Sequence, residues 1–94
     1  MNGYLIEIGR IVFSKSGRDA GKCFMIYDII DEDYVYLVDG NLRKLSKPKK
    51  KKIKHIELKK ARMEQIRDKI LSGKKVFDSE VYSAIENYLN SDEN

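Results

Sequence analysis

Residues 34–45 read YVYLVDGNLRKL, the clearest strand-and-turn pattern in the chain. β-Branched and aromatic side chains fill residues 34–38, a composition typical of a strand. The next three residues, Asp-Gly-Asn at 39–41, are a tight-turn signal between apolar runs. We therefore expect a β-hairpin whose second strand covers residues 42–45.

Short strands are also expected on both sides of this hairpin. Residues 11–13 are β-branched and aromatic, and residues 23–30, CFMIYDII, are apolar on both faces. A strand that is apolar on both faces is typical of the inside of a closed small barrel or sandwich. A polar loop, SKSGRDAG, fills residues 14–21, and apolar residues within 53–58 suggest a last strand. Short strands with turn signals at brief intervals predict a small β-barrel over residues 1–58.

The rest of the chain, residues 59–94, predicts two helices. Residues 59–72 carry an apolar stripe at helical spacing, and Gly73 is the expected stop. The second helix is expected to begin at Asp78 as its N-cap. Two short amphipathic helices do not bury their stripes alone, so we expect a hairpin packed on itself or on the barrel.

Charge is strongly segregated along the chain, although the net charge is only +4. Residues 43–60, RKLSKPKKKKIKHIELKK, hold ten Lys and Arg residues against one acid, Glu57. Pro48 places this block on an exposed loop or strand edge. Such a block repels itself unless a polyanion neutralises it, and lysines bind nucleic-acid phosphates by releasing counterions. The alternative is a solvated, disordered run.

Residues 17–23, GRDAGKC, only superficially resemble a phosphate-binding loop. The Walker pattern has four residues between its glycines and a Ser or Thr after the lysine, whereas this loop has three residues and Cys23. The sequence shows no other arrangement of catalytic residues, so we predict that the protein is not an enzyme.

Single residues with reactive or aromatic side chains each have a structural interpretation. Cys23 is expected to be a small buried side chain, and His55, without a second His or Cys nearby, a packing residue or phosphate contact. Tyr34 and Tyr36 either fill the barrel core or rim, or stack on unpaired bases. We expect no metal and no cofactor. One cysteine, no signal peptide and no long apolar run predict a cytoplasmic protein without membrane contact.

The sequence also resembles a known family. Gly9-Arg-Ile-Val12, Gly17-Arg-Asp-Ala-Gly-Lys22 and Ile29-Ile-Asp31 look like a KOW motif. With Asp39-Gly40, residues 43–45 and residues 47–55, the chain is similar to KOW-type large-subunit ribosomal proteins of the fourteen-e group and to small bacterial KOW-domain RNA-binding proteins. The resemblance covers roughly residues 6–58. It implies an SH3-like five-stranded barrel that contacts ribosomal RNA.

The resemblance and the charge pattern together give a set of candidate RNA-binding residues. Gly17 and Gly21 are expected to shape the loop, with Gly21 at the turn of the motif. The acidic turn at 31–33 is expected to lie away from the RNA. The candidates for phosphate contact are Lys15, Arg18, Lys22, Arg43, Lys44, Lys47, Lys49, Lys50, Lys51, Lys52, Lys54 and His55.

We therefore predict a cytoplasmic RNA-binding protein, with ribosomal RNA as the expected target. Charge alone does not distinguish RNA from DNA, because both carry phosphates. The alternative is a KOW-type protein-interaction module in transcription or translation. The second helix has no basic residue from Val76 onward, which suits a protein partner better than RNA. That helix alternatively covers the open end of the barrel.

Overall fold

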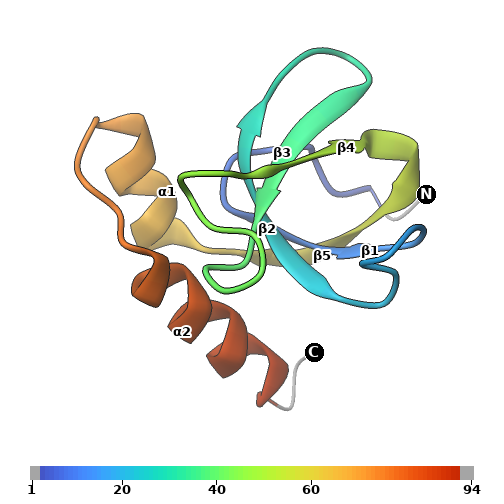
Figure 1. Ribbon diagram of the computed structural model, residues 1–94. Coiled ribbons are helices and arrows are strands. Elements are labelled where there is room, and N and C mark those ends of the chain that lie inside the picture. The colour runs from blue at the N-terminus through green and yellow to red at the C-terminus, as the bar shows by residue number, and fades with distance from the viewer. Residues whose placement is uncertain (1–2, 92–94) are drawn as a thin grey trace.

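A computed structural model describes residues 3–91 as a five-stranded antiparallel sheet followed by two helices (Figure 1). The ends of the expected units, residues 1–2 and 92–94, lie outside the described residues. The prediction of a mainly β fold with a helical appendage is confirmed. The elements are β1 (Arg10–Ser14), β2 (Cys23–Ile29), β3 (Tyr34–Val38), β4 (Lys49–Lys52), a short helical turn (Ile53–His55), β5 (Ile56–Arg62), α1 (Glu64–Leu71) and α2 (Asp78–Leu89).

The sheet is not the closed barrel that we expected. Its strand order is β4-β3-β2-β1-β5, so β4 and β5 are the two edges. β4 has only four residues. Directly after it, the Ile53 amide donates a 2.8 Å hydrogen bond to the Asp33 carbonyl beside β3. The helical turn then redirects the chain into β5, which pairs with β1.

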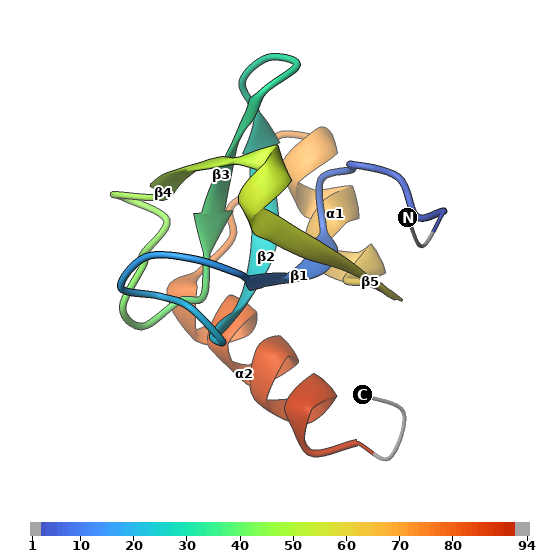
Figure 2. The ribbon, with the colours of Figure 1, turned by 90° about the vertical axis from the view of Figure 1, so that its right-hand side faces the viewer.

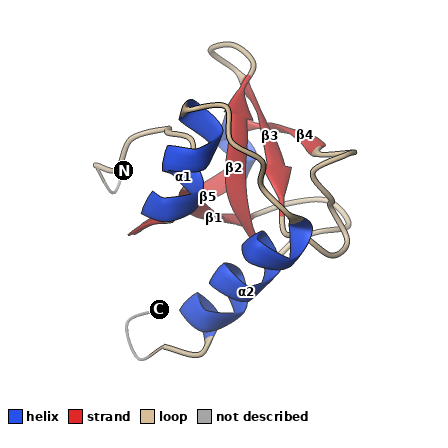
Figure 3. Ribbon diagram, turned by 90° about the vertical axis from the view of Figure 1, so that its left-hand side faces the viewer, coloured by secondary structure: helices blue, strands red, loops and turns tan. Residues whose placement is uncertain are grey.

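Two apolar clusters form the core, one on each face of the sheet. Alternate residues such as Val12 and Phe24 pack inside the curved sheet, whereas Ile11 and Met25 face the other way. The helices cover that second face (Figure 3), where Ile66 of α1 joins the cluster. The prediction that residues 23–30 include a strand buried on both faces is therefore confirmed for Cys23–Ile26. The physical reason is the helical cover and not barrel closure.

The strand expected at residues 42–45 is absent, although the turn before it forms as predicted. The Asp39 carboxylate accepts hydrogen bonds from the amides of Asn41 and Arg43, which closes the turn. The chain then turns away, because the Leu45 amide binds the carboxylate of Asp78 at 2.8 Å. The partner of β3 is instead the lysine run of β4.

The first helix begins five residues later than expected, at Glu64. β5 continues to Arg62, which pairs with Arg10 of β1, and the Met63 amide donates to the Gly9 carbonyl. Tertiary strand pairing here overrides the helix propensity of Lys and Ala. The expected stop is confirmed: α1 ends at Leu71, and Gly73 has a φ of +76°.

The second helix begins where expected, but Asp78 does not cap it. Phe77 precedes the helix, and its amide donates to the carboxylate of Glu80 at 2.9 Å. The Asp78 carboxylate is occupied by the Leu45 amide and so fastens α2 to the β3–β4 loop. Val81 and Ile85 pack on the sheet, so of the two arrangements expected the helices adopt the one against the β-domain. Within residues 3–91, neither helix is long and apolar enough to cross a membrane.

Candidate nucleic-acid interface

The fold brings together two basic segments that lie about forty residues apart in the sequence. The Lys15 amide donates a 2.8 Å hydrogen bond to the His55 carbonyl. The Lys51 ammonium donates a 2.7 Å hydrogen bond to the Ser16 carbonyl. The β1–β2 loop and the turn after β4 therefore lie on the same side of the molecule, away from α1 (Figure 2). We call this surface the basic face; its members are Lys15, Lys51, Lys52, Lys54 and His55.

The electrostatic character of the basic face is visible at its histidine. The pKa of His55 is lowered, first because partial burial disfavours the charged imidazolium. Repulsion from Lys54, Lys51, Lys52 and Lys15 lowers the pKa further. The repulsion from these lysines, unlike the burial, also favours a bound anion.

β4 presents lysines on both faces of an edge strand. Lys50 lies opposite Tyr36 and Lys52 opposite Tyr34, so these four side chains share one face. The ammonium nitrogens of Lys50 and Lys52 lie 4.5 Å and 6.0 Å from the centre of the Tyr34 ring. Lysines on an edge strand also discourage pairing with other chains, which is a structural role for the same residues.

Tyr34 and Tyr36 lie on the rim of the β-domain and in neither core cluster. Both are half-buried, whereas their neighbours Val35 and Leu37 point inward and are fully buried. Of the structural positions expected from the sequence, core or rim, both tyrosines therefore take the rim. The aromatic surface of Tyr34 remains partly accessible beside the lysines.

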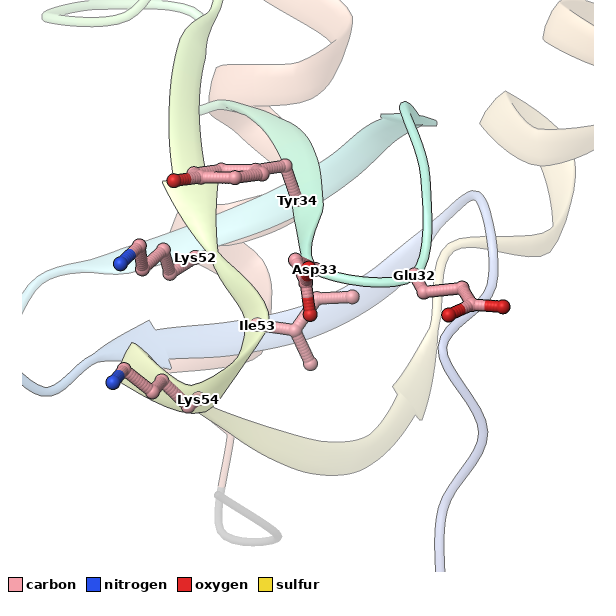
Figure 4. A pocket seen from close by; sticks show the side chains of 6 residues that line it. All are labelled: Glu32, Asp33, Tyr34, Lys52, Ile53 and Lys54. Atoms are coloured by element: carbon pink, nitrogen blue, oxygen red, sulfur yellow. The ribbon is translucent and has the colours of Figure 1, made fainter.

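A cleft adjoins Tyr34 at the end of β4. It is lined by Glu32, Asp33, Tyr34, Lys52, Ile53 and Lys54 (Figure 4). The figure shows Lys52 and Lys54 extending to one side and Glu32 pointing to the other. The acidic turn thus lies beside two of the candidate lysines, although we expected it at the end away from the RNA. The Glu32 side chain nevertheless points away from them.

Arg43 is held by an internal ion pair that the sequence did not reveal. The Asp19 carboxylate is nearly buried, and Arg43 binds it through Nη2 at 2.9 Å and Nε at 3.0 Å. Lys22 lies 4.0 Å from the same carboxylate. Of the residues expected to contact phosphate, Arg43 thus also fixes the β1–β2 loop against the β3–β4 loop. The pairing joins residues 24 positions apart, and no local pattern marks it.

The other candidates are more scattered. Arg18, Lys44 and Lys47 are exposed on loops, and Lys49 is half-buried opposite Leu37. Gly17 and Gly21 have φ values of +78° and +84°, a backbone conformation that residues other than glycine rarely adopt.

Basic residues at the other end of β1 serve the fold. The Arg10 guanidinium is nearly buried and donates a 2.7 Å hydrogen bond to the Lys60 carbonyl. Arg62 pairs with Glu7, and this contact is the main reason that the pKa of Glu7 is lowered. These arginines are therefore not part of the basic face.

Cys23 is buried, and burial raises the pKa of its thiol to about 12. The thiol therefore stays protonated at neutral pH, as expected for a packing residue. Within the described part of the chain, no group of three His, Cys, Asp or Glu side chains is placed to hold a metal ion.

The structure thus defines a small antiparallel β-domain with a glycine-shaped basic loop beside a lysine-rich edge strand. The chain is 42% identical over 52 residues to the large ribosomal subunit protein eL14 of Staphylothermus marinus, which covers 55% of this chain and 54% of that protein. It is 35% identical to eL14 of Methanococcus vannielii, over 55% of this chain and 61% of the relative. For eL14 of Desulfurococcus amylolyticus the identity is 42%, over 55% and 54%.

The resemblance to KOW-type ribosomal proteins of the fourteen-e group is confirmed by these similarities. The chain spans between about half and three fifths of the length of the relatives it matches. No family model matches the chain.

Proposed function

We propose that this protein binds RNA of the large ribosomal subunit and docks through the basic face. The observation that carries the proposal is the junction of the β1–β2 loop with β4, which gathers Lys15, Lys52 and Lys54 around His55. The similarity to large ribosomal subunit proteins supports ribosomal RNA as the target. This function requires no catalytic group, and the protein performs it in the cytoplasm.

The basic residues divide into two groups in this mechanism. Lys15, Lys52 and Lys54 contact phosphates and release condensed counterions, which supplies affinity without reading the sequence. Arg43 and Lys51 hold the loop against the sheet through Asp19 and Ser16. The rigid sheet then supplies the shape that positions the ammonium groups on structured RNA.

The test is the salt dependence of binding to a fragment of large-subunit ribosomal RNA. The variant Lys52→Ala/Lys54→Ala is compared with Lys74→Ala/Lys75→Ala, which removes the same charge from the exposed segment between α1 and α2. Removing one phosphate-neutralising lysine makes the negative slope of log K against log salt shallower by roughly 0.7 to 0.9. The Lys52→Ala/Lys54→Ala variant should therefore reduce its magnitude by about 1.5. Equal slopes for the two variants would contradict the docking face.

A second proposed function is protein docking through α2. Phe77 and Tyr82 are 55% and 44% exposed, and the helix carries no basic residue. Aromatic side chains are enriched at protein interfaces. If α2 holds a protein partner, association in a lysate survives RNase and is lost in the variant Phe77→Ala/Tyr82→Ala. Loss of all association after RNase would leave RNA docking as the function.

A further inference from the structure

We propose that the cleft beside Tyr34 holds a single unpaired nucleotide of the RNA, with its base stacked on the Tyr34 ring and its phosphate at Lys52 and Lys54. The inference rests on the proposed RNA binding and adds the class of RNA element that the site selects. A duplex shields the faces of its bases, so only a loop, bulge or unpaired end offers a base for stacking.

The first observation behind this proposal is the position of the Tyr34 side chain. Its ring lies outside both core clusters and is half-buried, so part of its aromatic surface faces solvent beside the lysines of β4. It occupies the first residue of β3, where the backbone is held by hydrogen bonds of the Tyr34 amide to Asp31 and of the Ile53 amide to Asp33. The ring is therefore presented at the cleft by a fixed backbone.

The second observation is the set of positive charges around the Tyr34 ring. Lys50 and Lys52 place ammonium nitrogens 4.5 Å and 6.0 Å from the ring centre, and Lys54 lines the same cleft. An aromatic platform flanked by ammonium groups is the arrangement that binds single strands, because the ring stacks the base while the cations hold the backbone. Aromatic stacking is sequence-tolerant, since every base has a π-face.

The third observation is that carboxylates line one side of the cleft. The cleft is lined by Asp33 and Glu32 as well as by the lysines, and Glu32 extends away from Lys52 and Lys54 (Figure 4). A carboxylate repels a free phosphate, whereas a nucleotide carries hydrogen-bond donors on its sugar and base that a carboxylate can accept. The mixed lining therefore suits a nucleotide, with its phosphate on the lysine side and its donors on the Asp33 side.

The alternative is that Lys50 and Lys52 contact Tyr34 only to stiffen the edge strand, which is a cation–π role without a ligand. The two interpretations differ in the RNA that the ring selects. A stiffened edge affects every RNA equally, whereas a stacking platform affects only unpaired bases.

The experiment measures the dissociation constants and salt slopes of the full chain for two RNAs of equal charge, one a single-stranded oligonucleotide and one a blunt duplex. The variants are Tyr34→Ala, Tyr34→Phe, which keeps the ring, and Tyr82→Ala, which removes an exposed tyrosine on α2. Tyr34→Ala is expected to weaken single-strand binding roughly tenfold, the reduction typical of one stacked base, with duplex binding and both slopes unchanged. Tyr34→Phe and Tyr82→Ala should bind as the unaltered protein does.

Two results would overturn the inference. Equal weakening on both RNAs, or no weakening on the single strand while the salt slopes still report phosphate binding, would refute the nucleotide subsite and leave the proposed function intact. If the unaltered protein binds neither RNA at low salt, the proposed function itself fails and the subsite with it.

Discussion

The ammonium group of Lys51 donates a 2.7 Å hydrogen bond to the carbonyl of Ser16 and so joins β4 to the β1–β2 loop. A β-carbon on the adjacent Gly17 would lie 3.4 Å from the same ammonium nitrogen, in close contact. Lys50, the preceding residue of the strand, points to the other face and contacts the Tyr34 ring. Neighbouring lysines of one run thus have different roles, and the first prediction separates them.

Lys51→Met is expected to lower the free energy of unfolding by about 1 kcal/mol, because it removes a charge-assisted hydrogen bond at a partly exposed site. Lys50→Met serves as the control and should change stability by less than about 0.5 kcal/mol, as exposed substitutions do. Urea denaturation measures both values. A Lys51 variant as stable as the control would show that the hydrogen bond does not hold the loop.

Arg43 supports the fold through the nearly buried Asp19 carboxylate. Arg43→Met leaves that carboxylate without its closest partner, and we expect the free energy of unfolding to fall by about 2 kcal/mol, less than for fully buried pairs because Arg43 is partly exposed. Lys44→Met removes a neighbouring exposed charge and should have little effect on unfolding. Similar denaturation midpoints for the two variants would rule out this structural role.

The lowered pKa of His55 makes it a reporter of the basic face. Protonated His55 is disfavoured in the folded state, so the unfolded state binds more protons and stability falls as the pH drops through the unfolded value near 6.5 towards the folded pKa. Bound RNA phosphates offset the repulsion from the lysines, so the pKa should rise on binding, and affinity should increase as the pH falls. NMR titration of the imidazole, with and without RNA, measures the shift.

The Lys54→Ala variant tests the cause of that shift. Lys54 is the largest electrostatic contributor after burial, so its removal should raise the pKa of His55 in the free protein. Lys74→Ala, on the exposed linker between the helices, should leave it unchanged. A pKa that rises neither on binding nor in the Lys54 variant would contradict the arrangement of lysines around His55.

Gly40 marks the place where α2 meets the sheet. A β-carbon at Gly40 would overlap the Asp78 carbonyl oxygen and lie 2.8 Å from the Tyr82 amide nitrogen, so Gly40→Ala must displace the helix. Gly73 also has a positive φ, +76°, but a β-carbon added there would have no atom within 4 Å. Gly73→Ala should cost only the conformational strain of about 1 kcal/mol, and Gly40→Ala clearly more. Equal costs by thermal denaturation would show that α2 does not pack there.

Local patterns predicted the elements whose character is set locally. The β-branched run at 34–38 forms β3, and the glycine after α1 ends that helix as expected. The errors occur where a distant contact decides. Pairing with β1 keeps residues 59–62 in β5, and the Leu45 amide takes the Asp78 carboxylate from its helix.

The candidate site shows the same division. The lysine run and the glycine loop were visible in the sequence, because charge and glycine patterns are local. Their junction through Ser16 and His55, and the internal role of Arg43, depend on contacts between residues at least 24 positions apart. The cleft beside Tyr34 likewise forms only when β4 pairs with β3.

Docking on the large ribosomal subunit is tested by sedimentation of the tagged protein from a native lysate on a sucrose gradient. The unaltered chain, Lys52→Ala/Lys54→Ala and Lys74→Ala/Lys75→Ala are compared at low and moderate salt, with and without RNase. We predict that the unaltered chain and the linker variant migrate with the large ribosomal subunit at moderate salt, and that the basic-face variant moves to the top of the gradient. Migration of the unaltered chain near the top in every condition would contradict docking on the large ribosomal subunit.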